Sequence, residues 1–257
     1  MLVLLSCAKT MSAVSKVKVP LTTSPRFQKE AAEIALQMSQ FSVDELERLL
    51  RVNAKIAVEN YKRYQAFHAE ATPELPALLA YTGIVFKRLN PKDFSAEDFG
   101  YAQEHLRLTS FCYGLLRPLD VIRAYRLGGD VVLPELGNQT LFSYWRSRLT
   151  DTFIEDIRSA GGILCNLASD EMKSLFDWKR VESEVRVVTP EFHVWKNGKL
   201  ATIVVYTKMS RGEMTRFILK NKIGNPEELK GFSWEGFEFD ESLSDERKLV
   251  FINGMGE

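Results

Sequence analysis

The stretch NQTLFSYWRSRLTDTFIEDIRSAGGILCNLA, residues 138–168, predicts a long helix followed directly by a buried strand. We expect Asn138 to cap the helix and the pair Gly161-Gly162 to end it. The apolar run at residues 162–168 is typical of a strand covered on both faces. A helix that leads into such a strand favours an α/β fold with a partly parallel sheet. Apolar side chains line one face of the helix at the spacing of its turns: Leu141, Phe142, Trp145, Leu149, Phe153 and Ile157.

The first half of the chain carries matching signals. Residues 2–5 form a short apolar run that predicts another buried strand. Ser42 and Ser95 are each followed three residues later by an acid, which is the pattern of a capping box at a helix start. Another helix is expected to begin near Asn53.

The last third of the chain predicts two hairpins. Residues 184–207 form two alternating runs joined by Asn197-Gly198, a strong signal for a tight hairpin turn. Residues 236–240 are expected to pair with residues 248–252 in a second hairpin.

Composition places the chain among ordinary globular proteins. Its 257 residues are 45% hydrophobic and 26% charged, and no repeat or linker interrupts them. We therefore expect one compact α/β domain over residues 1–257, with a mixed sheet and flanking helices. No apolar run approaches the roughly 20 residues of a membrane-spanning helix, and the run at the start lacks the basic flank of a signal peptide. We expect a cytoplasmic monomer with no membrane partner.

Cysteine and histidine usage predicts neither a metal site nor a bound cofactor. Cys7, Cys112 and Cys165 are odd in number and far apart, which argues against a disulfide framework and against a zinc site. The three histidines lack the four-residue spacing of a metal-binding pair.

The formal net charge of zero conceals an uneven distribution of charge. Residues 223–257 carry nine acids and three bases, a balance of −6, so residues 1–222 carry +6. A basic face on a neutral protein can attract a polyanion. The alternative is that acids and bases pair across the fold.

The loop after the first strand is one candidate for such a face. It holds Ser6, Lys9 and Thr10, and open α/β folds bind ligands where their strands end. No glycines stand at the spacing of a P-loop, so Lys9 could act only as a point charge. The alternative for Lys9 is an ordinary solvated lysine.

Residues 166–176 are a second candidate, because an apolar strand runs directly into Asn166, Ser169 and Glu171. Acids at this point can cap the start of a helix. Alternatively, Glu171 could be a general base, with Asn166 and Ser169 orienting a substrate.

Residues 206–222 are a third candidate, because they carry Lys208, Arg211 and Arg216 and few acids. We expect a helix to start near Ser210. The alternative is a solvated helix face.

Residues 110–126 carry further arginines, among them Arg117 and Arg126. Pro118 disfavours a helical conformation at Arg117. A guanidinium held on a turn suits a phosphate, since its fork pairs with two oxygens at once. The residues alone indicate an anion site and nothing finer.

Four motifs follow one another along the chain. They are Ser6-Cys7-Ala8-Lys9-Thr10, Leu116-Arg117-Pro118-Leu119-Asp120, Asn166-Leu167-Ala168-Ser169-Asp170-Glu171, and Lys208 with Arg211-Gly212. Through these motifs the chain resembles the YaaA family of bacterial peroxide-stress proteins over essentially its whole length.

The resemblance implies a family-specific fold, a positively charged cleft, binding to double-stranded and branched DNA, and a role in limiting damage by hydrogen peroxide and unincorporated iron. It also implies a helix-hairpin-helix element, which holds phosphates through the backbone amides of a glycine-containing turn. The chain keeps Gly83 and Gly114 at two such turns. It departs from the family pattern in having Arg88 and Phe111 at these turns and Cys7 in place of proline.

Two functions are consistent with these residues. The first is a DNA-binding stress protein whose cleft is lined by Lys9, Arg117, Arg126, Lys208, Arg211 and Arg216. The second is an enzyme acting on a nucleotide or phosphorylated small molecule, with Glu171 as base and with Lys9 and Arg117 holding the anion. An open basic groove would favour DNA, and an enclosed pocket would favour the enzyme. A third possibility, a purely structural or partner-binding protein, would be supported if the basic clusters were scattered and paired with the acidic tail.

Overall fold

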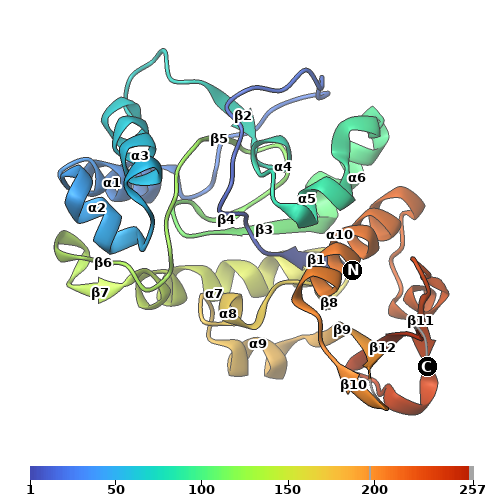
Figure 1. Cartoon of the computed structure of the whole chain (residues 1–257). Helices are drawn as coiled ribbons and strands as arrows, with labels where there is room; N and C mark the ends of the chain where they lie inside the picture. The colour runs from blue at the N-terminus through green and yellow to red at the C-terminus, as the bar shows by residue number, and fades with distance from the viewer. Residues whose placement is uncertain (197, 255–257) are drawn as a thin grey trace.

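One large mixed sheet crosses the middle of the molecule (Figure 1). The computed structural model describes residues 1–196 and 198–254. The strand order is β11-β12-β9-β8-β1-β3-β4, with β10 paired to β9. The strands are β1 (Leu2–Leu5), β3 (Leu106–Ser110), β4 (Gly114–Leu116), β8 (Ile163–Asn166), β9 (Arg186–Lys196), β10 (Lys199–Ala201), β11 (Phe237–Asp240) and β12 (Lys248–Asn253).

The central strands are parallel and the edges are antiparallel. β1 pairs in parallel with both β3 and β8, and β9 with both β8 and β12. β4, β10 and β11 pair antiparallel with their neighbours. All four residues of β1 are buried, as an apolar run in the middle of a parallel sheet should be. The predicted single compact α/β domain with a mixed sheet is confirmed.

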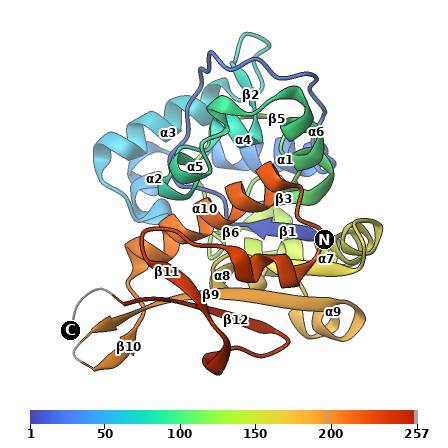
Figure 2. The same cartoon turned by 90° about the vertical axis from the view of Figure 1, so that its right-hand side faces the viewer.

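Helices cover both faces of the sheet. In Figures 1 and 2, α4, α5, α6 and α10 lie above the strand β1, and α7 and α8 lie below it. The helices are α1 (Gln28–Met38), α2 (Val43–Leu50), α3 (Ala54–Ala66), α4 (Ala77–Ala80), α5 (Ile84–Leu89), α6 (Ala96–His105), α7 (Leu141–Ser159), α8 (Asp170–Lys173), α9 (Trp178–Glu184) and α10 (Val204–Asn221). Two small ribbons pair β2 (Glu74–Pro76) with β5 (Val121–Arg123) and β6 (Val132–Leu133) with β7 (Gln139–Thr140). Over the residues described, none of the helices has both the length and the apolar character needed to cross a membrane.

The predicted helix starts agree with the structure in three of five cases. Ser42 and Ser95 form capping boxes, and Asn53 caps α3 by accepting a hydrogen bond from the Ile56 amide. The expectation that Asn138 caps the long helix is wrong. Asn138 has a left-handed backbone with φ 51°, and the Thr140 side chain caps α7 instead.

The first predicted hairpin is only partly correct. β10 pairs with β9 as expected, but it ends at Ala201, and α10 begins at Val204 instead of near Ser210. The residues of the expected second strand therefore open a helix, because packing of the long helix against the sheet outweighs the strand preference of a few β-branched residues. Asn197, the predicted turn residue, lies outside the described residues. The second predicted hairpin is confirmed, since β11 and β12 pair antiparallel.

A glycine lets α10 lie directly on α5. A Cβ atom on Gly212 would stand 2.3 Å from the Val85 carbonyl oxygen and 2.8 Å from the Arg88 Cβ. Because backbone atoms cannot move aside cheaply, only glycine permits this crossing. The crossing fixes the side chains on the neighbouring turns of α10 beside the end of β1.

Asp98 fastens α6 to α10. Its carboxylate accepts hydrogen bonds from Lys220 Nζ at 2.8 Å, from Lys222 Nζ at 2.6 Å and from the Ser95 amide at 2.9 Å. Burial by itself raises the pKa of Asp98, but these hydrogen bonds outweigh it and hold the pKa well below its usual range. Because the folded-state pKa is depressed, this stabilisation is present above the unfolded-state pKa of about 4 and is lost as the pH falls below it.

We expect Gly212→Ala to lower the free energy of unfolding by about 1–3 kcal/mol through overpacking, although alanine has the better helix propensity. Gly100→Ala is the matched control, since Gly100 also lies within a helix and its added Cβ would meet nothing within 4 Å. The control should be neutral or stabilising by up to about 1 kcal/mol. Urea unfolding measures both, and equal effects would contradict the close crossing of α5 and α10.

We expect Asp98→Asn to lower the free energy of unfolding by about 1–3 kcal/mol at pH 7, because two lysines lose their partner. The variant should also lose less stability than wild type between about pH 4 and pH 2, where Asp98 becomes protonated. Urea unfolding at several pH values tests this. The exposed Asp44→Asn serves as the control, and identical pH profiles for wild type and Asp98→Asn would contradict the role of Asp98.

Candidate functional site

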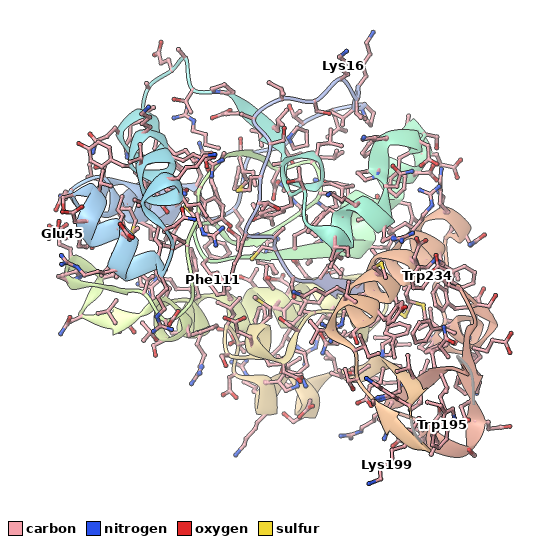
Figure 3. The ribbon with its side chains drawn as sticks, in the orientation of Figure 1. Lys16, Glu45, Phe111, Trp195, Lys199 and Trp234 are labelled. Carbon is pink, nitrogen blue, oxygen red and sulfur yellow. The ribbon has the colours of Figure 1, made fainter. Side chains whose placement is uncertain are left out.

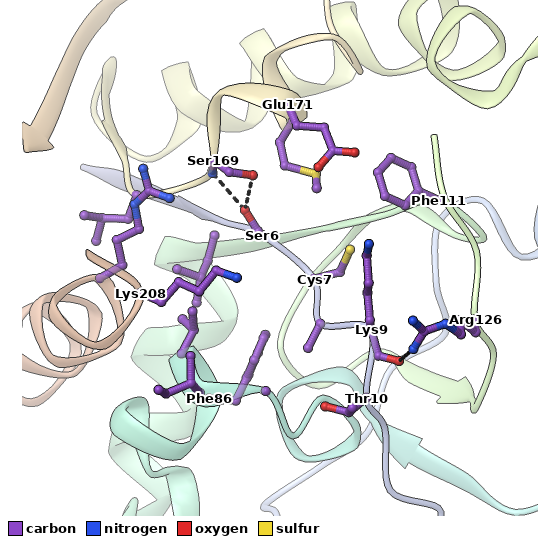
Figure 4. A pocket seen from close by; sticks show the side chains of 18 of the residues that line it. Ser6, Cys7, Lys9, Thr10, Phe86, Phe111, Arg126, Ser169, Glu171 and Lys208 are labelled. Carbon is purple, nitrogen blue, oxygen red and sulfur yellow. Dashed lines mark hydrogen bonds between the residues drawn. The ribbon is translucent and has the colours of Figure 1, made fainter. Parts of the chain in front are cut away.

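The site lies where the connections of the sheet diverge. From β1 the chain continues to β3 on one side, and β8, on the other side of β1, continues to β9. In open α/β sheets, ligands bind outside the carboxyl ends of the strands at such a point. Here Ser6 follows β1 and Ser169 stands three residues beyond β8. The Ser169 amide donates to Ser6 Oγ at 2.9 Å, and the two hydroxyl oxygens are 3.2 Å apart (Figure 4).

A cavity of about 330 Å³, which we call the Lys9 cavity, opens in front of these two serines. Figure 4 shows Lys208 from α10 and Lys9 from the loop after β1 on opposite sides of Ser6, with Arg126 next to Lys9. The structure brings eight of the candidate residues together around this cavity: Ser6, Lys9, Thr10, Arg126, Ser169, Glu171, Lys208 and Arg211. Four of these side chains are cationic and one, Glu171, is anionic, so the cavity is strongly basic.

Hydrogen bonds to neighbouring backbone hold the loop after β1 in place. Arg126 Nη1 donates to the Lys9 carbonyl at 3.2 Å, and the Thr82 amide donates to the Thr10 carbonyl at 3.0 Å. The start of α5 touches the loop so closely that a Cβ on Gly83 would lie 2.9 Å from the Ala8 Cβ. These contacts hold the loop in place as one wall of the cavity, so it is not a free surface loop.

Arg211 is the most unusual side chain of the cavity. Its Nε is buried and has no hydrogen-bond partner among the described residues. Burial lowers the pKa of Arg211, and the nearby Asp170 acts in the opposite direction. Asp170 itself pairs with Lys173 at 2.8 Å. A buried side-chain N–H group without a partner is uncommon in native structures and calls for an explanation, such as a role in binding a ligand.

The floor of the cavity is held by hydrogen bonds and offers no activated nucleophile. Tyr125 lines it, and its hydroxyl group lies 2.7 Å from the Tyr81 hydroxyl oxygen and 2.6 Å from Ser110 Oγ. Burial raises the pKa of the Cys7 thiol to about 12, so Cys7 is protonated at neutral pH. Since the thiolate is the reactive form of cysteine, Cys7 is not an activated nucleophile.

The other candidate residues lie outside this cavity. Arg117 forms an ion pair with the buried Asp120 at 2.9 Å and donates to the Ser24 carbonyl. Arg216, a residue of α10, forms an ion pair with Asp93. Asn166 is buried, and its side chain accepts a hydrogen bond from the amide two residues on. These three side chains hold loops and helices together.

A second hollow, which we call the lysine groove, was not predicted from the sequence. It has a volume of about 1020 Å³ and lies along the loop after β1, α4 and α5. Four exposed lysines line it: Lys16, Lys18, Lys87 and Lys92. Figure 3 shows Lys16 projecting from the top of the molecule. The basic runs SKVK and FKRLNPK were available in the sequence, but only the fold reveals that they meet.

The lysine groove is not neutralised by the protein itself. No carboxylate lines it, and within residues 1–196 and 198–254 none of its four lysines forms an ion pair. Arg88 of α5 turns away from it, toward Glu213 at 3.6 Å and over the ring of Trp234. The Lys9 cavity and the lysine groove share Phe86 as a wall.

The acidic tail does not pair with the basic clusters. For the described part of residues 223–257, Lys230 with Glu227 is the ion pair found, and it lies within the tail itself. Ion pairs do cross the fold elsewhere, as between Arg216 and Asp93, but pairing of the basic clusters with the acidic tail, on which the third possibility depends, is not found among the described residues. Within the part of the chain that the structure describes, no three or more His, Cys, Asp or Glu side chains are arranged to hold a metal ion.

Comparison with known proteins agrees with the motifs. The sequence profile of the family described as "Peroxide stress protein YaaA" matches residues 1–243. A UPF0246 protein of Bacteroides thetaiotaomicron is 99% identical over 257 residues, covering 100% of both chains. UPF0246 proteins of Porphyromonas gingivalis and Crocosphaera subtropica are 52% and 37% identical, covering 98% of this chain and 99% and 100% of their own. The chain therefore belongs to the YaaA family of peroxide stress proteins.

Proposed function

We propose that this protein binds the phosphate backbone of double-stranded or branched DNA through the lysine groove, as part of a peroxide-stress response. The observation that carries the proposal is the set of four exposed lysines, from two segments distant in sequence, with no acid among them. Lysines arranged in this way attract phosphates by charge and read no base sequence.

The backbone around the groove supports the same proposal. α4 and α5 are joined by a short turn that contains Gly83, and both helices line the groove. The helix-hairpin-helix implied by the family resemblance would be this pair of helices, although Gly83 itself packs on Ala8 and lines the smaller cavity instead of the groove. Gly114, the other glycine considered, lies in the tight β3–β4 hairpin with φ 70°, so it does not belong to a helical hairpin.

The wider role follows the family. The family description supports a function under peroxide stress, and DNA held in the groove would be a natural object of protection from oxidative damage. The link to unincorporated iron and the cytoplasmic location rest on the family resemblance. The formal net charge of zero leaves the protein without a general attraction for nucleic acid, so affinity should be modest and strongly dependent on salt.

We expect the protein to bind a labelled duplex and a four-way junction saturably at about 50 mM salt, and to lose at least tenfold in affinity at about 200 mM. Lys87→Ala with Lys92→Ala should weaken binding to both and lower the salt slope by about 2, because two phosphate contacts are lost. Fluorescence anisotropy measures each constant.

The control removes the same charge elsewhere. Lys55→Ala with Lys62→Ala takes two exposed lysines from α3, on another side of the molecule, and should leave the affinity and the salt slope nearly unchanged. Arg117→Ala should lower the stability through Asp120 more than it lowers DNA affinity. Absence of binding by wild type at about 50 mM salt, or equal losses in the two lysine pairs, would refute the groove as a DNA site.

A further inference from the structure

The Lys9 cavity differs from the lysine groove in a way that duplex DNA does not explain. Its four cationic groups come from three separate segments: Lys9 from the loop after β1, Arg126 from the segment after β5, and Lys208 with Arg211 from α10. Against them stands the single carboxylate of Glu171. Among the described residues none of these four side chains forms an ion pair.

The cavity also contains a buried polar atom that lacks a partner. Arg211 is half-buried, and among the described residues its buried Nε has no hydrogen-bond partner. A phosphate on the outer surface of a duplex would reach exposed lysines before it reached this group. The charge of Arg211 is therefore better explained by a small anion that enters the cavity than by a DNA backbone that passes over it.

The volume of the cavity and the residues that line it limit what the ligand can carry besides its anionic group. About 330 Å³ is at the lower end of the range of about 300–1,000 Å³ for small-molecule pockets. Phe86, Phe111 and Tyr125 line the cavity, and each is less than 5% exposed. Aromatic rings held by packing suit a flat apolar group, such as a nucleobase.

The cavity also offers hydrogen bonding beside the charges. Ser6 and Ser169 present hydroxyl groups 3.2 Å apart at the strand ends, and Glu171 presents an acceptor for the N–H or O–H groups of the organic part. A phosphate monoester carries a charge of about −1.5 to −2 at neutral pH and three acceptor oxygens, which matches several cations and two hydroxyls better than a single carboxylate would.

From these contacts we infer that the Lys9 cavity binds a nucleoside 5′-monophosphate, with Arg211 and Lys208 on the phosphate and the base against the aromatic wall. The inference goes beyond the proposed function, because it assigns a second ligand to a second hollow. The same chemistry is offered by a free mononucleotide and by the 5′-phosphorylated end of a DNA strand, and the experiment separates these two sources.

The experiment uses the full chain and isothermal titration with AMP, adenosine and inorganic phosphate. AMP should bind at least tenfold more tightly than adenosine, since charge-assisted hydrogen bonds to the phosphate are lost in adenosine. Arg211→Met and Lys208→Met should each weaken AMP binding at least tenfold. Lys87→Ala with Lys92→Ala should leave it within twofold of wild type.

A second measurement separates a ligand-binding arginine from a structural one. Because Arg211 Nε lacks a partner in the ligand-free protein, Arg211→Met should melt no lower than wild type, and a gain of up to about 4 °C in Tm is expected. A clear fall in Tm for Arg211→Met would show a structural arginine and overturn the inference. Lys208 is exposed, so Lys208→Met tests the site without risk to folding.

The last part of the experiment tests whether the ligand is the 5′-phosphorylated end of a DNA strand. Duplexes with a 5′-phosphate overhang and with a 5′-hydroxyl overhang are compared by anisotropy in wild type and Arg211→Met. A preference for the phosphorylated end that Arg211→Met abolishes identifies the strand end as the source, and binding of AMP without such a preference identifies the free nucleotide. Failure of both AMP and the phosphorylated end to bind overturns the inference while leaving duplex binding through the lysine groove as a separate result.

Discussion

The hydrogen bonding of β1 on both sides, to β3 and to β8, is the constraint on which the rest of the structure depends. A strand of four residues has no freedom to shift register when every side chain is buried and both edges are paired. The point at which the chain leaves the sheet is therefore fixed, and so is the position of Ser6 beside Ser169. Everything that surrounds the Lys9 cavity, including the α5–α10 crossing at Gly212, is built around that exit.

Much of this architecture could be predicted from local patterns. The apolar run at residues 2–5, the capping residues Ser42 and Ser95 and the pairing of β11 with β12 each follow from chemistry within a few residues. The start of α10 could not be predicted, because Val204 and Val205 favour a strand and only the packing of the whole helix overrides them. Asparagine and threonine are both common N-cap residues, so residue type did not distinguish Asn138 from Thr140. The left-handed backbone of Asn138 leaves Thr140 as the cap of α7.

The candidate arginines fall into two groups, those for which the fold supplies a carboxylate partner and those for which it does not. Arg117 and Arg216 looked like phosphate ligands because each follows or lies in a basic run, yet Asp120 and Asp93 neutralise them in the folded chain. Pairing between residues distant in sequence cannot be read from spacing, which is why the sequence could not distinguish these arginines from Arg211. The lysines of the groove escaped notice for the converse reason, since exposed lysines are common and only their convergence makes them informative.

The uneven distribution of charge between the acidic tail and the rest of the chain gives the neutral protein an electric dipole. Residues 223–257 carry −6 and the remainder +6, and Figures 1 and 2 place the tail at the end of the molecule opposite the loop that carries Lys16. A molecule of this kind feels little net pull toward a distant polyanion, but the electric field near a polyanion exerts a torque on its dipole and turns it. Its basic end is presented first and its acidic end is held outward, so orientation is selected before any contact forms.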